Sequence, residues 1–219
     1  MNITDYILNE IKPLSLKSNV EQAIDLFNNF PITHFPVVEE NKLLGSFAED
    51  EMHTAIDVKS ELISHAHLLN SFFADEKATT LELLKIFADN DTNIIPVLND
   101  SKNYIGYYDL RDVLDVFSTS PFMIEESETL IIEHTVNDYS MSEVAQIVES
   151  NNGKLIGVYI SDKNNDFIQL TLKIISNDIH EIMHTFRRYE YKIISMHDND
   201  IYLEDLKNRS DYLQKYLEM

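Results

Sequence analysis

An internal repeat constrains what this chain can fold into more than any other feature. Residues 35–38 read Phe-Pro-Val-Val, and residues 95–98, sixty positions later, read Ile-Pro-Val-Leu. The same shift aligns apolar residues at helical spacing upstream. A shift of 61 aligns strand-like runs centred on Gly45 and Gly106 downstream. Self-similarity over this length predicts two copies of one roughly 60-residue α/β unit.

Each copy is expected to run from a short strand into an amphipathic helix, then a strand, a polar turn, a second strand and a closing helix. Ser18 or Asn19 and Thr79 or Thr80 are the expected helix caps. The first copy spans about residues 3–56 and the second about 68–118, within a repeat region of 1–118. Residues 57–70, which link the copies, are expected to be helical.

Charge and composition exclude several classes of function. The chain has 17 basic and 38 acidic side chains, for a net charge of −21, which disfavours nucleic acid and anionic lipid surfaces. It has no cysteine, which excludes disulfides and thiolate metal sites. No apolar stretch reaches the length of a membrane span, and the N-terminus has no leader pattern, so a cytoplasmic location is expected.

A different pattern follows residue 118. Alternation and helical spacing predict a second domain over residues 124–200 in the order βαββαβ, with strands at 130–136, 154–161, 167–175 and 191–196 and helices at 140–149 and 179–189. Ser140 and Glu143 form a predicted capping box, and Asn177 or Asp178 can cap the second helix. Residues 201–219 have the spacing of an amphipathic C-terminal helix.

The repeat resembles a tandem pair of CBS domains, the Bateman module, over about residues 3–118. The resemblance implies that the copies pack about a pseudo-twofold axis and form clefts for adenosine-containing regulatory ligands, of which AMP, ADP, ATP and S-adenosylmethionine are the ones considered. It also implies a homodimer.

In that family, the strand glycine is followed by two apolar residues, then Thr or Ser that helps hold phosphate, two variable residues, and an Asp that binds ribose hydroxyls. The second copy matches with Asp112 at the ribose position, whereas Asp109 replaces the hydroxyl residue and would repel phosphate. Arg111 is the nearby cation that could face a phosphate. Two alternatives stay open: Asp112 as a helix N-terminal carboxylate and Arg111 as a solvated side chain.

The first copy departs further from the family pattern. Ala48 stands in place of the hydroxyl residue and Glu51 in place of the Asp. The backbone at the apolar-Pro step lines the adenine pocket in the family, which implicates Ile94, Ile95 and Pro96 in the second copy and His34 and Phe35 in the first. The alternative for His34 is a half-buried packing residue.

The second domain resembles an ACT-like regulatory domain, a ferredoxin-like sheet with two helices on one face, over about residues 128–197. Amino-acid-binding ACT domains usually carry a glycine in the turn after the first strand. Residues 137–140 read Asn-Asp-Tyr-Ser and contain none.

These features favour a stand-alone regulatory protein over an enzyme. The CBS pair would sense an adenosine-type ligand, and the ACT-like domain would supply dimerisation or a second effector site. The alternative is an interaction or scaffold protein with degenerate clefts and an unknown protein partner. The pairs His65 and His67, and His180 and His184, have no recognisable third ligand, so no metal site is expected.

Overall fold

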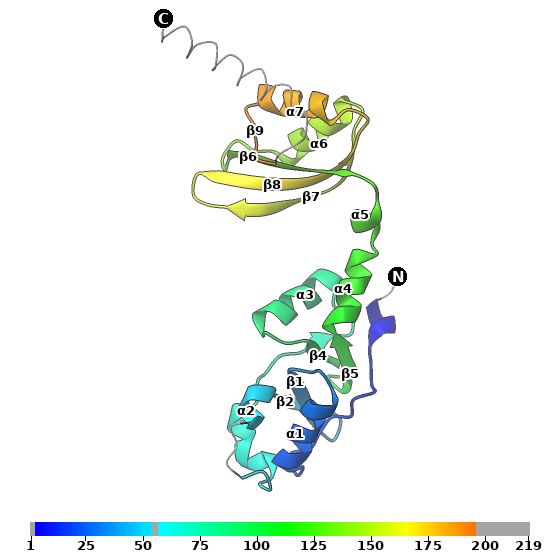
Figure 1. Ribbon diagram of the computed structural model, residues 1–219, viewed down its shortest axis with the longest axis vertical. Helices are drawn as coiled ribbons and strands as arrows, with labels where there is room; N and C mark the ends of the chain where they lie inside the picture. The colour runs from blue at the N-terminus through cyan, green and yellow to red at the C-terminus, as the bar shows by residue number, and fades with distance from the viewer. Residues whose placement is uncertain (1–2, 54–56, 196–219) are drawn as a thin grey trace, which may run out of the picture. The chain divides into compact units, whose positions relative to one another are not determined.

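The computed structural model describes residues 3–53 and 57–195, and the predicted C-terminal helix at 201–219 lies outside the described residues. The chain divides into two compact units (Figure 1), an N-terminal unit of residues 1–123 and a C-terminal unit of residues 124–219. The N-terminal unit contains both copies of the repeat.

The first copy follows the predicted element order from its first long helix onward, but the predicted leading strand is absent from its described residues. After the 3-10 helix η1 (Ile3–Tyr6), its elements are α1 (Val20–Asn29), β1 (His34–Glu39), β2 (Lys42–Ala48) and α2 (Glu49–His53). β1 and β2 form an antiparallel hairpin, and both turn residues, Glu40 and Asn41, have positive φ. That geometry suits a tight two-residue hairpin turn.

The second copy repeats this arrangement. Its elements are β3 (Ala74–Asp75), α3 (Thr80–Asp89), β4 (Ile94–Leu98), β5 (Tyr104–Asp109), α4 (Leu110–Ser118) and the short α5 (Pro121–Ile124). β3 pairs in parallel with β4, which pairs antiparallel with β5. In the first copy a single parallel bridge between Leu14 and Val37 takes the place of β3.

Both long helices of the repeat begin with the predicted kind of cap. Asn19 caps α1 and Thr79 caps α3, and each forms a complete capping box with the residue three positions later, Gln22 or Glu82. The boxes satisfy backbone N–H groups that the helix itself leaves without partners.

The linker between the copies differs from the prediction. Only Leu62–Leu68 is helical, as the 3-10 helix η2, whereas 57–61 form a turn. The reason is competition for hydrogen bonds: the N–H groups of Leu62 and Ile63 donate to Ser18 O and Leu16 O at 2.8 and 2.9 Å. An N–H engaged by another segment cannot join a local α-helical ladder.

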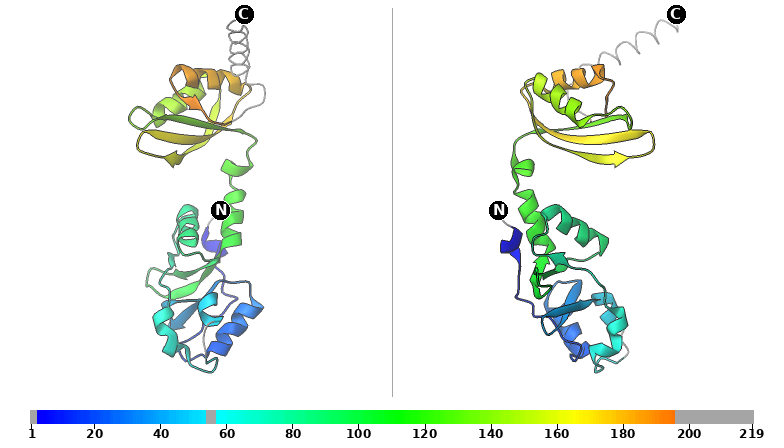
Figure 2. Two further views of the ribbon diagram at one scale, coloured as in Figure 1. Left: turned by 60° about the vertical axis from the view of Figure 1, so that its left-hand side comes forward. Right: turned by 180° about the vertical axis from the view of Figure 1, so that it is seen from behind.

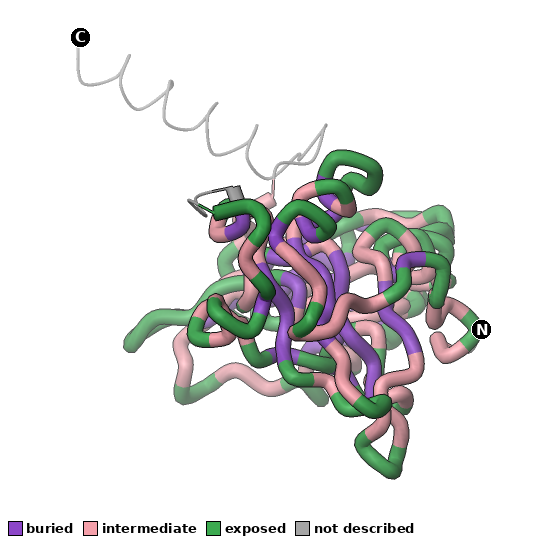
Figure 3. The backbone as a smooth tube through the Cα atoms, turned by 90° about the horizontal axis from the view of Figure 1, so that it is seen from below, coloured by how far each residue is buried: buried purple, intermediate pink, exposed green. Residues whose placement is uncertain are grey.

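The two copies share their apolar interior. One buried cluster forms around Phe35, Phe47 and Met52 of the first copy, but it also includes Ile94 and Tyr107 of the second. A second cluster forms around Leu83, Phe87 and Tyr108. Figure 3 shows the buried backbone in purple. Burial of this kind stabilises a fold by roughly 25 cal/mol per Å² of apolar surface.

The C-terminal unit has the predicted βαββαβ order. Its elements are β6 (Glu128–Thr135), α6 (Met141–Ser150), β7 (Lys154–Lys163), β8 (Phe167–Ile175), α7 (Ile179–Arg188) and β9 (Lys192–Ile193). The sheet is antiparallel in the order β7-β8-β6-β9, and both helices cover one of its faces (Figure 2).

Two predictions for this unit need correction at Tyr191. The last strand covers Lys192–Ile193 instead of starting at Tyr191, which is buried in the core. Ser140 caps α6, but Glu143 does not complete the capping box. The reason is that the Glu143 carboxylate accepts a hydrogen bond from Tyr191 Oη at 3.0 Å, and the Ser140 N–H donates to the same Oη at 3.4 Å. Burial raises the pKa of Tyr191 to about 12.

Candidate functional site

Thr33 and Asn93, which occupy equivalent positions in the two copies, hydrogen-bond to each other. The backbone N–H of Thr33 donates to Asn93 Oδ1 at 2.9 Å, and the backbone N–H of Asn93 donates to Thr33 Oγ1 at 3.1 Å. Thr33 Oγ1 also donates to Asn93 Oδ1 at 3.2 Å. Reciprocal contact between equivalent positions is what a twofold relationship produces. The pseudo-twofold axis of the repeat therefore passes between these two residues.

The closing helices of both copies start from this contact. The N–H of Glu49, the first residue of α2, donates to Thr33 O at 2.9 Å, and the N–H of Leu110, the first residue of α4, donates to Asn93 O at the same distance. The structure thus brings the predicted site residues of both copies to the two sides of the axis.

We group these residues into two half-sites. The first half-site consists of His34, Phe35, Ala48 and Glu51, and the second of Ile94, Ile95, Pro96, Asp109, Arg111 and Asp112. In each half-site the hairpin places the residue before the apolar-Pro step opposite the residue before the closing helix, which pairs His34 with Ala48 and Ile94 with Asp109.

Asp109 of the second half-site acts as a helix cap. Its side chain accepts a hydrogen bond from the N–H of Arg111 at 2.7 Å, which makes it the N-cap of α4. Asp is among the best N-cap residues, and its negative charge suits the helix N-terminus. The aspartate that replaces the family hydroxyl is therefore explained by local helix chemistry.

Asp112, on the first turn of α4, lies in acidic surroundings. Burial raises the pKa of its carboxyl, and the charges of Asp109, Asp115 and Glu10 raise it further. Burial also raises the pKa of Tyr107, on the adjacent strand, with contributions from Glu10, Asp109 and Asp112. Three carboxylates acting on a fourth create a region that repels anions and attracts hydrogen-bond donors and cations.

Arg111 is the cation of the second half-site, and its residue is exposed on the first turn of α4. Ile94, Ile95 and Pro96 are buried. The side chain of Ile94 packs in the first copy's cluster and that of Ile95 in the second copy's cluster. A ligand would therefore meet their backbone instead of their side chains.

In the first half-site, most side chains have structural roles. Phe35 is fully buried, with its ring centroid 5.1 Å from that of Phe27 and 5.8 Å from that of Phe47. The N–H of Ala48 donates to Glu51 Oε2 at 3.5 Å, a long contact across the first turn of α2.

His34 is 7% exposed and packs edge-on against Phe72, with ring centroids 5.3 Å apart. Its Nδ1 lies 3.0 Å from Thr33 Oγ1, next to the pseudo-twofold contact. Burial lowers the pKa of His34, and Asp91 partly opposes that shift. The imidazole is therefore held in its neutral form inside the N-terminal unit.

Replacing His34 with Ile, the residue at the equivalent position 94, is expected to reduce acid sensitivity. Because the folded pKa lies below the unfolded value of 6.5, the unfolded chain takes up the proton first as pH falls. The stability that neutral His34 contributes is complete above pH 6.5 and is lost as pH falls through the folded pKa. Urea unfolding of the N-terminal unit at pH 7.5 and 5.5 should show a smaller loss for His34→Ile than for the wild type. The exposed His67 offers a control, since His67→Gln should lose as much stability between the two pH values as the wild type. Equal losses of stability in all three proteins would show that the buried imidazole of His34 is not a source of acid sensitivity.

The sequence did not predict that each copy's leading segment pairs with the other copy. Leu8 forms an antiparallel bridge with Tyr107, and Asn70 forms one with Ser46. The only local signal is the glycine beside each bridge, Gly106 and Gly45. Ser46 Oγ is buried at this crossing and has no hydrogen-bond partner within the described chain.

Within the described residues, 3–53 and 57–195, no group of three or more His, Asp and Glu side chains is placed to hold a metal ion. No helix in the same ranges is long and apolar enough to cross a membrane.

Comparison with known proteins gives related matches to the repeat. A curated relative, inosine-5'-monophosphate dehydrogenase of Methanocaldococcus jannaschii, is 25% identical over 111 residues, which are 50% of this chain and 22% of that protein. The chain thus spans about a fifth of the length of the curated relative it matches.

Solved structures also match. A CBS domain pair/ACT domain protein of Thermotoga maritima is 14% identical with a TM-score of 0.48, over 53% of this chain and 96% of that one. The cytosolic domain of the Mg²⁺ channel MgtE in complex with ATP is 23% identical with a TM-score of 0.43, over 51% of this chain and 46% of that one.

The family model of the CBS domain matches this chain twice, at residues 3–57 and 63–119. The two matches coincide with the two copies of the repeat and together cover just over half of the 219 residues. The chain therefore belongs to the CBS domain family, and its N-terminal unit is a tandem CBS pair.

Proposed function

We propose that this protein is a regulatory sensor whose CBS pair binds an adenosine-type ligand through the second half-site. The match of both copies to the CBS domain family supports a regulatory role. The observation that carries the proposal is Asp112, a carboxylate kept partly desolvated among other carboxylates at the start of α4. A carboxylate in that state is a strong acceptor for the two hydroxyl hydrogens of a ribose.

The charges around Asp112 predict an order of affinity among the four adenosine-containing ligands. Asp109, Asp115 and Glu10 all act on this carboxyl, so phosphate groups placed near it would be repelled. S-adenosylmethionine carries a positive sulfonium and a ribose diol, AMP carries one phosphate, and ATP carries the most negative charge. We expect affinity to fall in the order S-adenosylmethionine, AMP, ADP, ATP.

Calorimetric titration of the full chain with these four ligands tests the proposal. Asp112→Asn should weaken binding of the preferred ligand about tenfold or more, because hydrogen bonds to charged groups contribute about 1.5–3 kcal/mol. Asp115→Asn is the matched control, since it removes the same charge one turn further along α4, away from the ribose position.

Three outcomes would count against the proposal. Absence of binding by all four ligands would overturn adenosine sensing. Equal losses in Asp112→Asn and Asp115→Asn would reduce the role of Asp112 to a general charge effect. Tightest binding of ATP would contradict the electrostatic account of the site.

A second candidate is an interaction protein with degenerate clefts. The observations that favour it are that Ala48 supplies no hydroxyl and that Asp109 is engaged as a helix cap. Under that proposal the full chain binds no adenosine ligand, and its function depends on a protein partner. The titration above separates the two candidates.

We propose for the C-terminal unit the role of an ACT-like domain that dimerises the protein or binds a second effector. The βαββαβ order and the helices on one face of the sheet support this assignment. Light scattering of the full chain should give twice the 25.5 kDa of one molecule. A monomer at all concentrations would overturn the dimerisation role, and binding of a second effector would then be the one proposed role of this unit.

A further inference from the structure

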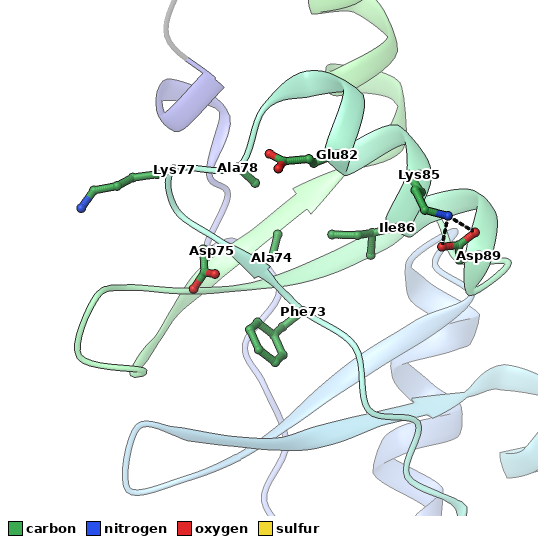
Figure 4. A pocket seen from close by; sticks show the side chains of 9 residues that line it. All are labelled: Phe73, Ala74, Asp75, Lys77, Ala78, Glu82, Lys85, Ile86 and Asp89. Carbon is green, nitrogen blue, oxygen red and sulfur yellow. Dashed lines mark hydrogen bonds and ion pairs between the residues drawn. The ribbon is translucent and has the colours of Figure 1, made fainter.

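The second copy has an open groove between its edge strand β3 and helix α3. The groove has a volume of about 470 Å³. Figure 4 shows apolar side chains from both elements, with polar ones along the rim; they include Phe73, Ala74, Ile86, Lys77, Glu82 and Lys85.

At one end of the groove, the backbone of residues 76–81 has a counterpart in the first copy, residues 16–21, that the chain itself covers. Segment 57–63 pairs with the residues that lead into α1 and with its first turn. The N–H groups of Val20 and Glu21 donate to Ser60 O and Val58 O at 3.1 and 2.9 Å. In the other direction, Leu16 O and Ser18 O accept the N–H groups of residues 63 and 62. Four backbone groups of the first copy are thus satisfied by one peptide segment.

The second copy presents the same four backbone groups without this segment. They are the N–H groups of Thr80 and Leu81 and the carbonyl groups of Glu76 and Ala78, each sixty positions after its counterpart. No hydrogen bond to these four groups is formed by residues 3–53 or 57–195. Two unpaired carbonyl acceptors followed by two unpaired N–H donors can serve as a template for an added peptide segment, as their counterparts do in the first copy.

The side chains around the groove favour an apolar, uncharged occupant. Leu81 is 68% exposed and Phe73 is 41% exposed, where the first copy carries Glu21 and Pro13. Among the charged side chains, Glu82 accepts hydrogen bonds from Thr79, and the others are paired within the second copy. These pairs are Lys85 with Asp89 at 2.7 Å, Lys77 with Asp100 at 2.6 Å and Lys102 with Asp75 at 2.7 Å.

One difference between the copies defines the shape of the occupant. In the first copy Leu62 of the covering segment is fully buried, in the same cluster as Val20 and Ala23. The second copy has Leu83 at the position of Ala23, and Leu83 is itself fully buried. The larger side chain fills space that Leu62 uses in the first copy, so the occupant should carry a small residue there.

We propose that this groove binds an extended peptide segment of a partner protein, paired to residues 76–81 as segment 57–63 pairs to residues 16–21. The segment has a small residue facing Leu83 and an apolar residue facing Leu81 and Phe73. This surface is separate from the two half-sites and does not depend on an adenosine ligand.

The test uses the full chain and a capped synthetic peptide with the sequence of residues 57–63, in which Leu62 is replaced by Ala and the charged Asp57, Lys59 and Glu61 are replaced by Asn, Gln and Gln. Binding is followed by the NMR shift of the Leu81 amide, which the wild type and both variants of Thr80 retain. Thr80→Pro deletes one donor, while Pro is well tolerated at the first position of a helix, and Thr79 has the extended backbone (φ −78°, ψ 158°) that a following Pro requires. Thr80→Ala keeps the N–H and is the matched control.

Thr80→Pro should raise the Kd of the peptide about tenfold, whereas Thr80→Ala should leave it unchanged. Unchanged binding by Thr80→Pro, or no binding at millimolar peptide, would overturn the proposal. Hydrogen exchange of the free protein adds a second check. Slow exchange at Thr80 and Leu81 without peptide would show that this chain already fills the groove. If that slow exchange depended on protein concentration, the occupant would be a second copy of this chain. Either result would overturn the proposal of a partner protein's peptide.

Discussion

Replacing Gly106 with Ala should destabilise the N-terminal unit by about 3 kcal/mol or more, the largest effect of any single methyl group we expect in this protein. Gly106 has φ +150°, which side chains rarely adopt. An added Cβ would also lie 2.3 Å from Leu8 O and 2.8 Å from Ile7 Cγ2. The leading segment would have to move away from β5.

That movement breaks a specific pair of hydrogen bonds. The N–H of Leu8 donates to Tyr107 O at 2.8 Å, and the N–H of Tyr107 donates to Leu8 O at 2.9 Å. Losing two bonds of about 1 kcal/mol each adds to the backbone strain of about 1 kcal/mol or more. Native-state hydrogen exchange at amides of the N-terminal unit measures the loss without contributions from the C-terminal unit.

Gly45→Ala is the control with similar backbone strain and a smaller steric clash. Gly45 has nearly the same φ, +153°, but an added Cβ would meet Asn70 O and Leu69 Cβ at 3.0 Å, a distance that small shifts can relieve. We expect about half the destabilisation of Gly106→Ala. Equal effects of the two substitutions would show that φ strain dominates and that the crossing of the leading segment contributes little.

The sequence predicted the repeat and its elements because their signals are local. The apolar-Pro-Val pattern at 35–38 and 95–98 lies within buried strands, and the residues before each helix act as caps. Such patterns depend on neighbours a few positions away, and the chain carries each of them twice. Agreement between the two copies removed ambiguities that one copy would have left.

The exchange of leading segments could not be predicted in the same way. Leu8 and Tyr107 are about a hundred positions apart, and their bridge is made by backbone atoms that every residue carries. Only the absence of a side chain at Gly106 records the crossing. Glu10 comes to Asp112 by the same route, which is why the acidic surroundings of the second half-site were also missed.

Asp109, Arg111 and Asp112 lie at the start of α4, as the helical pattern indicated, but their individual roles depend on geometry. Asp109 was predicted to oppose phosphate, which stays a prediction, and the structure shows that its carboxylate caps α4. A sequence pattern gives the position of a residue in the family motif. It does not say whether a local hydrogen bond already uses the side chain.

Replacing Asn93 with Ala should destabilise the N-terminal unit by about 2–3 kcal/mol and loosen both half-sites together. The Asn93 side chain accepts from the N–H and Oγ1 of Thr33 and donates to Pro31 O at 2.7 Å, so three hydrogen bonds are lost. Asn93→Asp, which keeps the acceptor oxygen but not the donor, should lose less.

Because the contact between Thr33 and Asn93 lies on the pseudo-twofold axis, the loosening of both half-sites can be measured at two specific amides. Because the backbone of Thr33 holds Glu49 N–H and that of Asn93 holds Leu110 N–H, a disturbance between them reaches the starts of α2 and α4 equally. Hydrogen exchange should therefore accelerate at Glu49 and Leu110 by similar factors in Asn93→Ala. Acceleration at Leu110 alone would mean that the two half-sites are supported independently, and a ligand bound at one could then not influence the other through this contact.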